Sequence, residues 1–450
     1  MFKKILIANR GEVALRVMRA ARELEVSTVA VYSTADKDTL PVRYADEAVC
    51  IGPAPAAKSY LVMENIIMAA KMTGAEAIHP GYGFLAENAT FARMCEENDI
   101  IFIGPSPECI ERLGDKSEAR STMKLFGVPT VPGSAGAVAT PEDAEAYAQA
   151  VGYPVLIKAS AGGGGKGMRE VHEPEEMAAQ FKAARTEAAA AFGNDEVYLE
   201  KLILRPRHVE VQVLADEFGN RAALCERDCS IQRRHQKLVE EAPSPALDAD
   251  LRRAMCRTAL KVVRAVGYTN AGTVEFLLDG DGHFYFMEMN TRVQVEHPVT
   301  EQITGVDIIK EQLRIAAGEP MMVSQRTDIE PFGHAMEFRI NAEDPEAGFR
   351  PCPGTITRFE VPAGPGVRVE TYLGQGDCVS PYYDSLIAKL VIHGQDREEV
   401  MARARRALND FRIEGIATTI PFHLRVLNNE CFRSGDFTTD FIETQMGDLL

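Results

Sequence analysis

Four features are scarce or missing from this 450-residue sequence, and each absence argues against a class of protein. No apolar run approaches the roughly 18 residues that cross a bilayer, so we expect no membrane span. Residues 1–8 lack the apolar stretch and cleavage region of a secretory signal. Positive charge is in deficit, since 49 lysines and arginines stand against 66 acidic residues and give a net charge of −17. Such a surface repels phosphate backbones, so we expect no nucleic acid partner.

Cysteine is sparse and follows no pattern. The nine cysteines are an odd number, scattered between Cys50 and Cys431. Cys225 and Cys229 are the closest pair, and neither a second pair nor a histidine pair completes a zinc site. We interpret these two as core or near-site thiols rather than nucleophiles. The cysteine content fits a reduced, cytoplasmic compartment.

What remains has the composition of a globular protein, with 46% apolar and 26% charged residues. The length suggests two to four domains, whose cores need no disulfide or metal for stability. We see no internal repeat and no long linker. The pattern of predicted strands, helices, glycines and prolines changes near residues 114 and 330. We therefore predict domains at 1–114, 115–330 and 331–450.

Residues 1–114 alternate short apolar runs with helical patterns. Strands are predicted at 5–8, 27–32, 75–79 and 100–103, and helices at 12–25 and 63–73. This alternation is typical of an open parallel α/β sheet. The first turn holds only one glycine, Gly11, so a dinucleotide site is not expected there.

The later regions are mixed α and β. A helix is predicted at 116–126, followed by strands at 153–158 and 168–172 and an alanine-rich helix from Pro174 to about residue 192. Further strands are predicted at 196–203, 208–215, 221–226, 272–279 and 283–290, with a helix at 251–266. Residues 331–450 combine short strands with a helix at 397–411, and we interpret them as an α+β domain.

A glycine run, 162–167, is the most prominent local signal. Gly162, Gly164 and Gly167 fit the dinucleotide pattern, but a strand follows where that motif needs a helix. The run is not a P-loop either, because Gly167 replaces the required Ser or Thr. It suits a mobile flap whose backbone amides and Lys166 close over phosphates; a flexible surface hairpin is the alternative. Lys158, in the apolar strand before the run, should have an anionic partner.

The strands around Asp281-Gly282 form the second signal, since this dipeptide favours a two-residue type I′ turn. In that register Glu275 faces Glu288, and Asn290 lies on the same face. Adjacent carboxylates need a proton or a cation, and an all-oxygen set suits Mg²⁺ or Mn²⁺. Two exposed acids on an edge hairpin are the alternative, and a three-residue loop would place the acids on opposite faces.

A third signal runs from residue 290 to residue 298. In an extended segment Arg292, Gln294 and Glu296 share one side and continue the face of Glu288. Such a set suits a small oxyanion with a general base beside it. We interpret His297 as a packing residue or as a support behind the site residues. The basic run 232–237 is either a ligand site or a solvated charge cluster, and the turn at 79–84, which contains Tyr82, is either a tight turn or a ligand edge of the sheet.

Several long motifs resemble biotin carboxylases. They are ILIANRGE at 5–12, GYGFLAEN at 81–88, YPVLIKASAGGGGKG at 153–167, ERDCSIQRRHQK at 226–237 and FMEMNTRVQVEHP at 286–298. The resemblance covers essentially the whole chain and is strongest to the free-standing subunit type of bacterial acetyl-CoA carboxylase. It implies an ATP-grasp domain with a glycine-rich lid subdomain at about 131–203, between a Rossmann-like N-terminal domain and a C-terminal α+β domain, in a homodimer.

The resemblance also implies site residues. Those expected to hold ATP are Lys116, Lys158, Gly163, Gly164, Gly165, Lys166, Met168, Glu200, Lys201, Ile203, His208, Gln232, His235 and Leu277. Those expected to hold Mg²⁺ or Mn²⁺ are Glu275, Glu288 and Asn290. Bicarbonate would contact Arg292, Gln294 and Val295, with Glu296 as its base; Lys237 would bind phosphoryl oxygens, and Arg339 and Tyr82 would face biotin.

The implied reaction is ATP-dependent carboxylation of biotin by bicarbonate through carboxyphosphate, as the first half-reaction of acetyl-CoA carboxylase in fatty acid synthesis. The chain lacks the Ala-Met-Lys-Met hairpin that carries biotin, so we expect a biotin carboxyl carrier protein and carboxyltransferase subunits as partners. The alternatives are a subunit of a propionyl-CoA, pyruvate or other carboxylase, another ATP-grasp ligase, and a nucleotide-sensing subunit without turnover.

Overall fold

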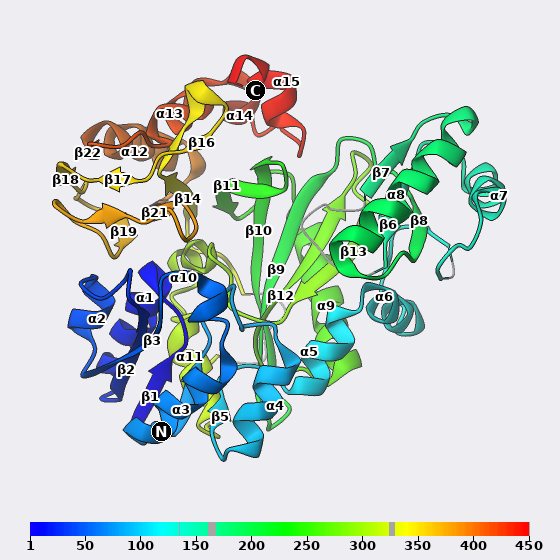
Figure 1. Cartoon of the computed structure of the whole chain (residues 1–450). Coiled ribbons are helices and arrows are strands. Elements are labelled where there is room, and N and C mark those ends of the chain that lie inside the picture. Colours follow the sequence, from blue (N-terminus) through cyan, green and yellow to red (C-terminus); the bar gives the residue numbers. More distant parts are fainter. Residues whose placement is uncertain (135, 161–167, 324–328, 450) are drawn as a thin grey trace.

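The computed structural model describes residues 1–134, 136–160, 168–323 and 329–449. The glycine run therefore lies outside the described residues, together with the predicted lid positions Gly163, Gly164, Gly165 and Lys166. Figure 1 shows three groups of elements around one large sheet: the N-terminal region at lower left, the C-terminal region at upper left, and a small sheet with two helices at right.

The N-terminal region is a five-stranded parallel sheet, as the alternating pattern predicts. Its strand order is β3 (Glu47–Gly52), β2 (Ser27–Ser33), β1 (Lys4–Ile7), β4 (Ala77–His79) and β5 (Ile101–Phe102). Its helices are α1 (Gly11–Glu23), α2 (Leu40–Tyr44), α3 (Met63–Thr73), α4 (Ala89–Glu97) and α5 (Pro107–Gly114), with the short η1 (Ala56–Lys58). The prediction missed β3, an edge strand with little apolar alternation and several exposed positions.

The small sheet of the central region is antiparallel, with the order β7 (Met168–Val171), β6 (Val155–Ala159) and β8 (Val197–Lys201). Its helices are α7 (Pro141–Val151) and α8 (Met177–Phe192), which follows η2 (Pro174–Glu176). Their alanine-rich faces pack on the apolar side of β6 and β8 in a core of their own. Helix α6 (Lys116–Leu125) connects this region to the first.

The large sheet has eight strands, and every neighbouring pair is antiparallel. In spatial order the strands are β13 (Phe284–Asn290), β12 (Asn270–Leu278), β9 (Arg207–Ala215), β10 (Arg221–Arg233), β11 (Gln236–Ala242), β14 (His334–Asn341), β21 (Leu386–Gly394) and β19 (Val367–Thr371). The predicted domain boundary near residue 330 therefore falls inside one continuous sheet, between β11 and β14.

Helices cover this sheet. Helix α9 (Ala249–Val266) packs on β9 and β10, while α10 (His297–Thr304) and α11 (Ile308–Ala316) lie toward the N-terminal region. The C-terminal helices are α12 (Arg397–Asp410), α13 (Ile420–Asn428), α14 (Glu430–Ser434) and α15 (Phe441–Gln445). The remaining short elements are η3 (Pro345–Ala347), η4 (Gly447–Leu449), β15 (Glu343–Asp344), β16 (Arg350–Pro351), β17 (Gly354–Thr355), β18 (Arg358–Glu360), β20 (Cys378–Val379) and β22 (Arg412–Glu414).

The β12–β13 hairpin differs from the predicted turn type but keeps the predicted pairing of Glu275 with Glu288. The backbone N–H of Asp279 donates to the carbonyl of His283 at 2.9 Å, so the loop has three residues and the expected two-residue type I′ turn is wrong. The Asp279 carboxylate fixes this wider loop by accepting the N–H of residue 281 at 3.0 Å and of His283 at 2.8 Å. A bulge at Met287 then shifts the register by one residue, so Glu275 faces Glu288 after all.

Two further local predictions need correction. Residues 291–296 form bends and a turn rather than an extended segment, because α10 begins directly after them, at His297. Strand β10 continues to Arg233 and strand β11 begins at Gln236, so within the run 232–237 only residues 234 and 235 lie outside the sheet. Among the described residues, no helix is both long and apolar enough to span a lipid bilayer.

Candidate active site

A row of charged side chains crosses four strands of the large sheet. Glu288 on β13 faces Glu275 on β12, which faces Glu210 on β9, which in turn faces Arg227 on β10. Directly paired residues point to the same face of a sheet, so three carboxylates lie side by side. Glu288 keeps 37% of its side chain exposed, whereas that of Glu275 is 5% exposed and that of Glu210 is fully buried. The row is open to solvent only at its β13 end.

Lys237 connects the buried acids. Its ammonium group lies 2.6 Å from Glu210, 3.2 Å from Glu275 and 2.6 Å from Glu296. Burial alone would lower the pKa of Lys237, but the surrounding negative groups outweigh burial and hold that pKa well above its usual value. Lys237 is therefore protonated, and its positive charge lies among three carboxylates.

Glu296 is fully buried and held by two cations. Its Oε1 accepts from Lys237 at 2.6 Å, and its Oε2 accepts from the guanidinium of Arg339 at 2.9 Å. Burial would raise the pKa of Glu296, yet these two cations hold it well below its usual range. The carboxylate is ionised at neutral pH, as the predicted base must be.

Arg339 brings the C-terminal region into the site. It lies on β14, and its Nε donates to Glu240 of β11 at 2.6 Å while Nη2 reaches Glu296. The backbone carbonyl of Arg339 accepts from His423 of α13 at 2.7 Å, which braces the strand at this position. The residue is thus held at both its side chain and its backbone.

The predicted oxyanion residues converge although their segment is not extended. Arg292 donates to Gln294 at 2.9 Å and to Asn290 at 3.1 Å, and Gln294 donates to Glu275 at 3.2 Å. The remaining face of the guanidinium pairs with Glu87, 2.8 Å from Nε. Val295 turns its carbonyl toward the buried Lys389, which donates to it at 2.9 Å.

Several residues expected at the nucleotide have acidic partners. Lys158 lies 3.0 Å from Glu200, which confirms the expected anionic partner. Burial would lower the pKa of the Lys158 ammonium, but Glu200, with smaller contributions from Tyr198 and Glu288, holds it above its usual value. Lys116 lies 3.6 Å from Glu288.

The other expected nucleotide residues are less tightly engaged. Lys201 turns its ammonium toward the carbonyls of Gly152 and Tyr153, at 2.8 and 2.9 Å. His235 is exposed in the β10–β11 turn. Four more are placed by backbone register or sequence: Gln232 faces Lys237, Met168 faces Lys158, Leu277 faces His208, and Ile203 follows β8.

The acids of β12 and β13 offer oxygen ligands of the kind that Mg²⁺ or Mn²⁺ prefers. Glu275 and Glu288 are adjacent, and the Asn290 amide donates to Glu275 at 2.7 Å. The ring of His208 lies 3.0 Å from the second oxygen of Glu275. Burial would raise the pKa of Glu275, but Lys237 and His208 hold it well below its usual range, so this carboxylate is available as an anionic ligand.

Tyr82 extends the site into the N-terminal region. Its hydroxyl donates to Glu12, whose carboxylate also lies 3.2 Å from Lys389. Burial, followed by Glu12, raises the pKa of Tyr82 well above its usual value, while Arg339 counteracts this. The phenol is therefore neutral and lies within electrostatic range of Arg339.

The thiols and His297 have structural surroundings. Cys225 and Cys229 are buried, and burial raises the pKa of both thiols, so neither is a ready nucleophile. Cys229 lies close to Glu296, with 4.0 Å between its sulfur and a carboxylate oxygen of Glu296. His297 is fully buried and hydrogen-bonded to the carbonyl of Gln294 at 2.8 Å, as its interpretation as packing requires.

Four site residues were missed by sequence reasoning: Glu87, Glu210, Arg227 and Glu240. Glu87 lies inside the GYGFLAEN motif, so a search of that motif for a partner of Arg292 could have suggested it. Glu210 follows His208 at the alternation of a strand and could have been found in that way. Arg227 lies inside the ERDCSIQRRHQK motif and could have been suggested like Glu87. Glu240 could not, because its partner lies on a strand whose position in the sheet the sequence leaves open.

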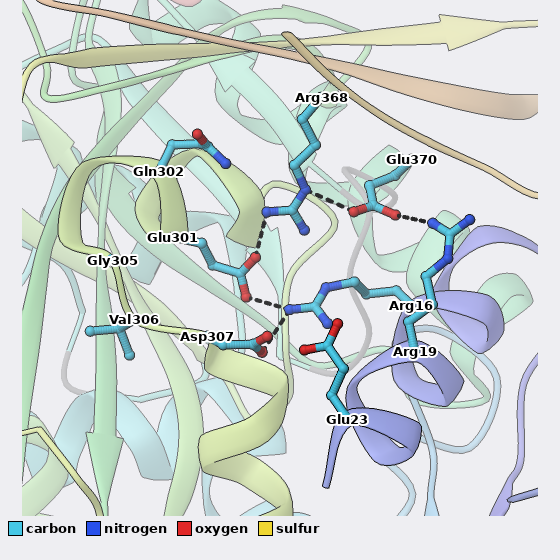
Figure 2. Close-up of a pocket in the computed structure, with 10 residues that line it drawn as sticks. All are labelled: Arg16, Arg19, Glu23, Glu301, Gln302, Gly305, Val306, Asp307, Arg368 and Glu370. Carbon is cyan, nitrogen blue, oxygen red and sulfur yellow. Dashed lines mark hydrogen bonds and ion pairs between the residues drawn. The ribbon is translucent and has the colours of Figure 1, made fainter. Parts of the chain in front are cut away.

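A separate charged pocket lies away from these residues, between the three regions of the chain. Figure 2 shows Arg16 of α1 between Glu301 and Asp307, at 2.8 and 2.7 Å. Arg368 of β19 connects Glu301 to Glu370, at 2.8 and 2.7 Å. The residues that line this pocket include none of the predicted site residues. These pairs join α1, α10 and β19, so the pocket is a contact between regions of the fold.

Comparison with known proteins gives three family matches in chain order. Residues 1–110 match the biotin carboxylase N-terminal domain, residues 115–323 match the ATP binding domain of the carbamoyl-phosphate synthase L chain, and residues 337–444 match the biotin carboxylase C-terminal domain.

Relatives of similar length match the whole chain. Biotin carboxylase 1 of Bacillus subtilis is 57% identical over 445 residues, which cover 99% of both chains. A pyruvate carboxylase subunit of Methanothermobacter thermautotrophicus is 53% identical over 443 residues, covering 98% of this chain and 90% of that protein.

Solved structures agree. The biotin carboxylase of Campylobacter jejuni in a β,γ-ATP complex superposes with a TM-score of 0.96 at 47% identity, covering 99% of both chains. The biotin carboxylase domain dimer of Hydrogenobacter thermophilus 2-oxoglutarate carboxylase, with MgADP and bicarbonate, superposes with a TM-score of 0.95 at 51% identity, covering 100% of this chain and 99% of that one.

Proposed function

Because this chain belongs to the biotin carboxylase family, we propose that it is the ligase that carboxylates biotin with bicarbonate at the expense of ATP. The predicted resemblance and its three-domain ATP-grasp architecture are confirmed by the family matches. The observation that carries the proposal is the buried carboxylate Glu296, bonded to both Lys237 and Arg339 and two residues from Gln294. This arrangement combines a base, a phosphate-binding cation and an oxyanion site.

Bicarbonate is a poor electrophile, so its activation is the first task. Arg292 and Gln294 orient the anion, and Glu296 takes its proton as the bicarbonate oxygen attacks the γ-phosphorus of ATP. Lys237 and Arg339 hold the pKa of Glu296 well below its usual range. When Lys237 turns to phosphoryl oxygens, Glu296 loses one of these cations and its pKa rises, so the base becomes effective only with substrate present.

The nucleotide is held by the residues that the resemblance assigns to it. Lys116 and Lys158 neutralise phosphate charge, each leaving the acidic partner it has in the free site. Glu275, Glu288 and Asn290 would hold Mg²⁺ or Mn²⁺, and such an ion would supply positive charge toward the phosphate oxygens.

In the second step of the proposed reaction, biotin accepts the carboxyl group. Carboxyphosphate formed in the site breaks down to CO₂ and phosphate, and the phosphate takes the proton of the biotin ureido nitrogen. Arg339 stabilises the negative charge that develops on the ureido oxygen while the nitrogen attacks CO₂. Tyr82, close to Arg339, lines the side of the N-terminal region.

Biotin comes from another chain, a biotin carboxyl carrier protein, and a separate carboxyltransferase uses the product. The relative from B. subtilis bears the name biotin carboxylase, and we propose acetyl-CoA as the final acceptor. The relatives named for pyruvate and 2-oxoglutarate carboxylases favour a keto acid as the second candidate. The H. thermophilus dimer supports a homodimer, and nine free thiols support a cytoplasmic location.

The function is tested by measuring ADP release with bicarbonate and free biotin, each present or omitted, together with transfer of labelled bicarbonate to biotin. We expect full turnover only when both are present. Turnover with ammonia or an amino acid in place of biotin would indicate another ATP-grasp ligase. Tight ATP binding without turnover under every condition would indicate a nucleotide-sensing protein.

A further inference from the structure

Two glutamates behind Arg339 form a buried pair that the proposed reaction does not use. Glu240 of β11 and Glu337 of β14 are direct partners in the antiparallel register, and both are fully buried. Directly paired residues lie about 5 Å apart at Cβ and share one face of the sheet. Arg339, two residues beyond Glu337, lies on the same face and faces Lys389 of β21.

The hydrogen bonds of the pair are unequal. Glu240 accepts from the Nε of Arg339 at 2.6 Å through one oxygen. Among the described residues, its other oxygen and both oxygens of Glu337 have no hydrogen-bond partner. The nearby ammonium of Lys389 instead donates to the carbonyl of Val295 at 2.9 Å and pairs with Glu12 at 3.2 Å. Within the part of the chain that the structure describes, Glu337 is thus a completely buried carboxyl group that forms no ion pair.

An unpaired buried carboxylate is costly, and two adjacent ones also repel each other. Burial, reinforced by Glu296, raises the pKa of Glu240 to about 7 against the opposing charges of Arg339 and Lys237. Burial and Glu240 raise the pKa of Glu337 well above its usual value, despite Lys389 and Arg339. Further groups around the pair are Tyr82 and Glu12 of the N-terminal region.

We propose that Glu240 and Glu337 share one proton and together position Arg339, with Glu240 as the anion that aims the guanidinium and Glu337 as the neutral acid. This inference rests on the proposed role of Arg339 toward biotin. An ionised Glu337 would be a second anion beside Arg339 on the same strand face, and it would draw the guanidinium away from Glu296. With a proton, Glu337 is neutral and does not compete with Glu296 for the guanidinium of Arg339. Both are positioning residues that act through Arg339.

The first test is infrared spectroscopy of the whole protein at a pH where surface carboxyl groups are ionised. We expect the C=O stretching band of a protonated carboxylic acid, and we expect Glu337→Gln to remove it. Glu241→Gln is the matched control, because Glu241 is also buried on β11 but has its pKa lowered to about 2 by His334 and Arg397 in spite of burial. Absence of the band in the unmodified protein, or its survival in Glu337→Gln, would overturn the shared proton.

The second test separates the two roles by kinetics. Glu337→Gln is a neutral isostere, so KM for biotin should stay within about twofold, whereas Glu240→Gln should raise it by roughly tenfold or more through loss of the charge-assisted bond. Bicarbonate-dependent ATP cleavage without biotin should change little in Glu337→Gln. Equal losses in both variants would contradict the division of roles, and Glu240→Asp should restore part of the biotin affinity.

The two tests also separate this inference from the proposed function. If the unmodified protein carboxylates no biotin, the proposed function fails while the infrared band still reports on the pair. If Glu337→Gln does not fold, the band of the unmodified protein and the Glu240 variants still decide between the outcomes. A protein that carboxylates biotin but lacks the acid band contradicts only the inference.

Discussion

At the scale of single residues, the site is defined by how each charge is paired. Lys237 forms ion pairs with three carboxylates and Arg339 with two. The acids therefore compete for a small number of shared positive groups. Buried groups connected in this way respond together when a substrate removes one partner. The roles assigned to individual residues stay predictions, and substitutions can test them one at a time.

Replacing Glu296 with alanine tests the assigned base. We expect biotin carboxylation to fall by at least roughly a hundredfold, because general base catalysis typically contributes that much, while ATP still binds. Labelled-bicarbonate transfer and nucleotide titration measure the two properties. Glu360→Ala, at an exposed position of β18, is the control. Unchanged transfer in the Glu296 variant would remove this residue from the mechanism.

Replacing Glu87 with glutamine tests its contact with Arg292. Glu87 accepts from Arg292 at 2.8 Å and from the backbone N–H of Thr291 at 3.0 Å, and it is 41% exposed. We expect KM for bicarbonate to rise by roughly threefold to tenfold, because a partly exposed ion pair contributes about 1 kcal/mol, with KM for ATP unchanged. Glu97→Gln, exposed at the end of α4, is the control. An equal rise in both constants would indicate a general loss of structure.

At the scale of elements, the β12–β13 hairpin shows how a local error can be compensated. The three-residue loop alone would have placed Glu275 and Glu288 on opposite faces, and the bulge at Met287 restores their pairing. Neither feature is visible in the alternation of the strand residues. The pairing of the two acids therefore depends on two backbone irregularities acting together.

Gly282→Ala tests the loop. Gly282 has φ of +84° in the left-handed region, and no atom lies within 4 Å of a Cβ added there. We expect a loss of about 1–2 kcal/mol in the free energy of unfolding, measured in urea, because only the backbone conformation is penalised. Gly280→Ala in the same loop also meets open space but lacks the positive φ, so it should be close to neutral. Equal stability of both variants would show that the loop adapts.

At the scale of the whole molecule, the site is assembled from three regions. Glu87 comes from the N-terminal region, Lys237 and Glu296 from the central region, and Arg339 from the C-terminal region. The large sheet passes without interruption from β11 to β14, so the predicted boundary at residue 330 is not a break in hydrogen bonding. The domain boundaries stay predictions, and the regions should unfold cooperatively.

Buried histidines predict a loss of stability in acid. Burial lowers the pKa of both His79 and His423 to about 4, below the ordinary value near 6.5. In this pH range the histidines bind protons in the unfolded chain but not in the folded chain. The free energy of unfolding therefore falls as the pH drops from about 6.5 to about 4. At ~1.4 kcal/mol per pKa unit, each histidine contributes about 3 kcal/mol to this loss.

His423→Gln should flatten this dependence, since glutamine can still donate to the carbonyl of Arg339 but does not titrate. Urea unfolding at several pH values between 4 and 7 measures the slope. His172→Gln, at an exposed position, is the control and should keep the original slope. A slope that is unchanged in His423→Gln would assign the acid sensitivity to other groups.

Local periodicity and long contiguous motifs were sufficient to predict the parallel N-terminal sheet, the oxygen-rich acids of β12 and β13, and the family. Three other features follow only from the folded arrangement: Glu240 belongs to the site, β11 continues into β14, and Glu337 has no hydrogen-bond partner among the described residues. The physical reason is that strand order and the pairing of buried charges depend on contacts between residues far apart in the chain, which no local pattern encodes.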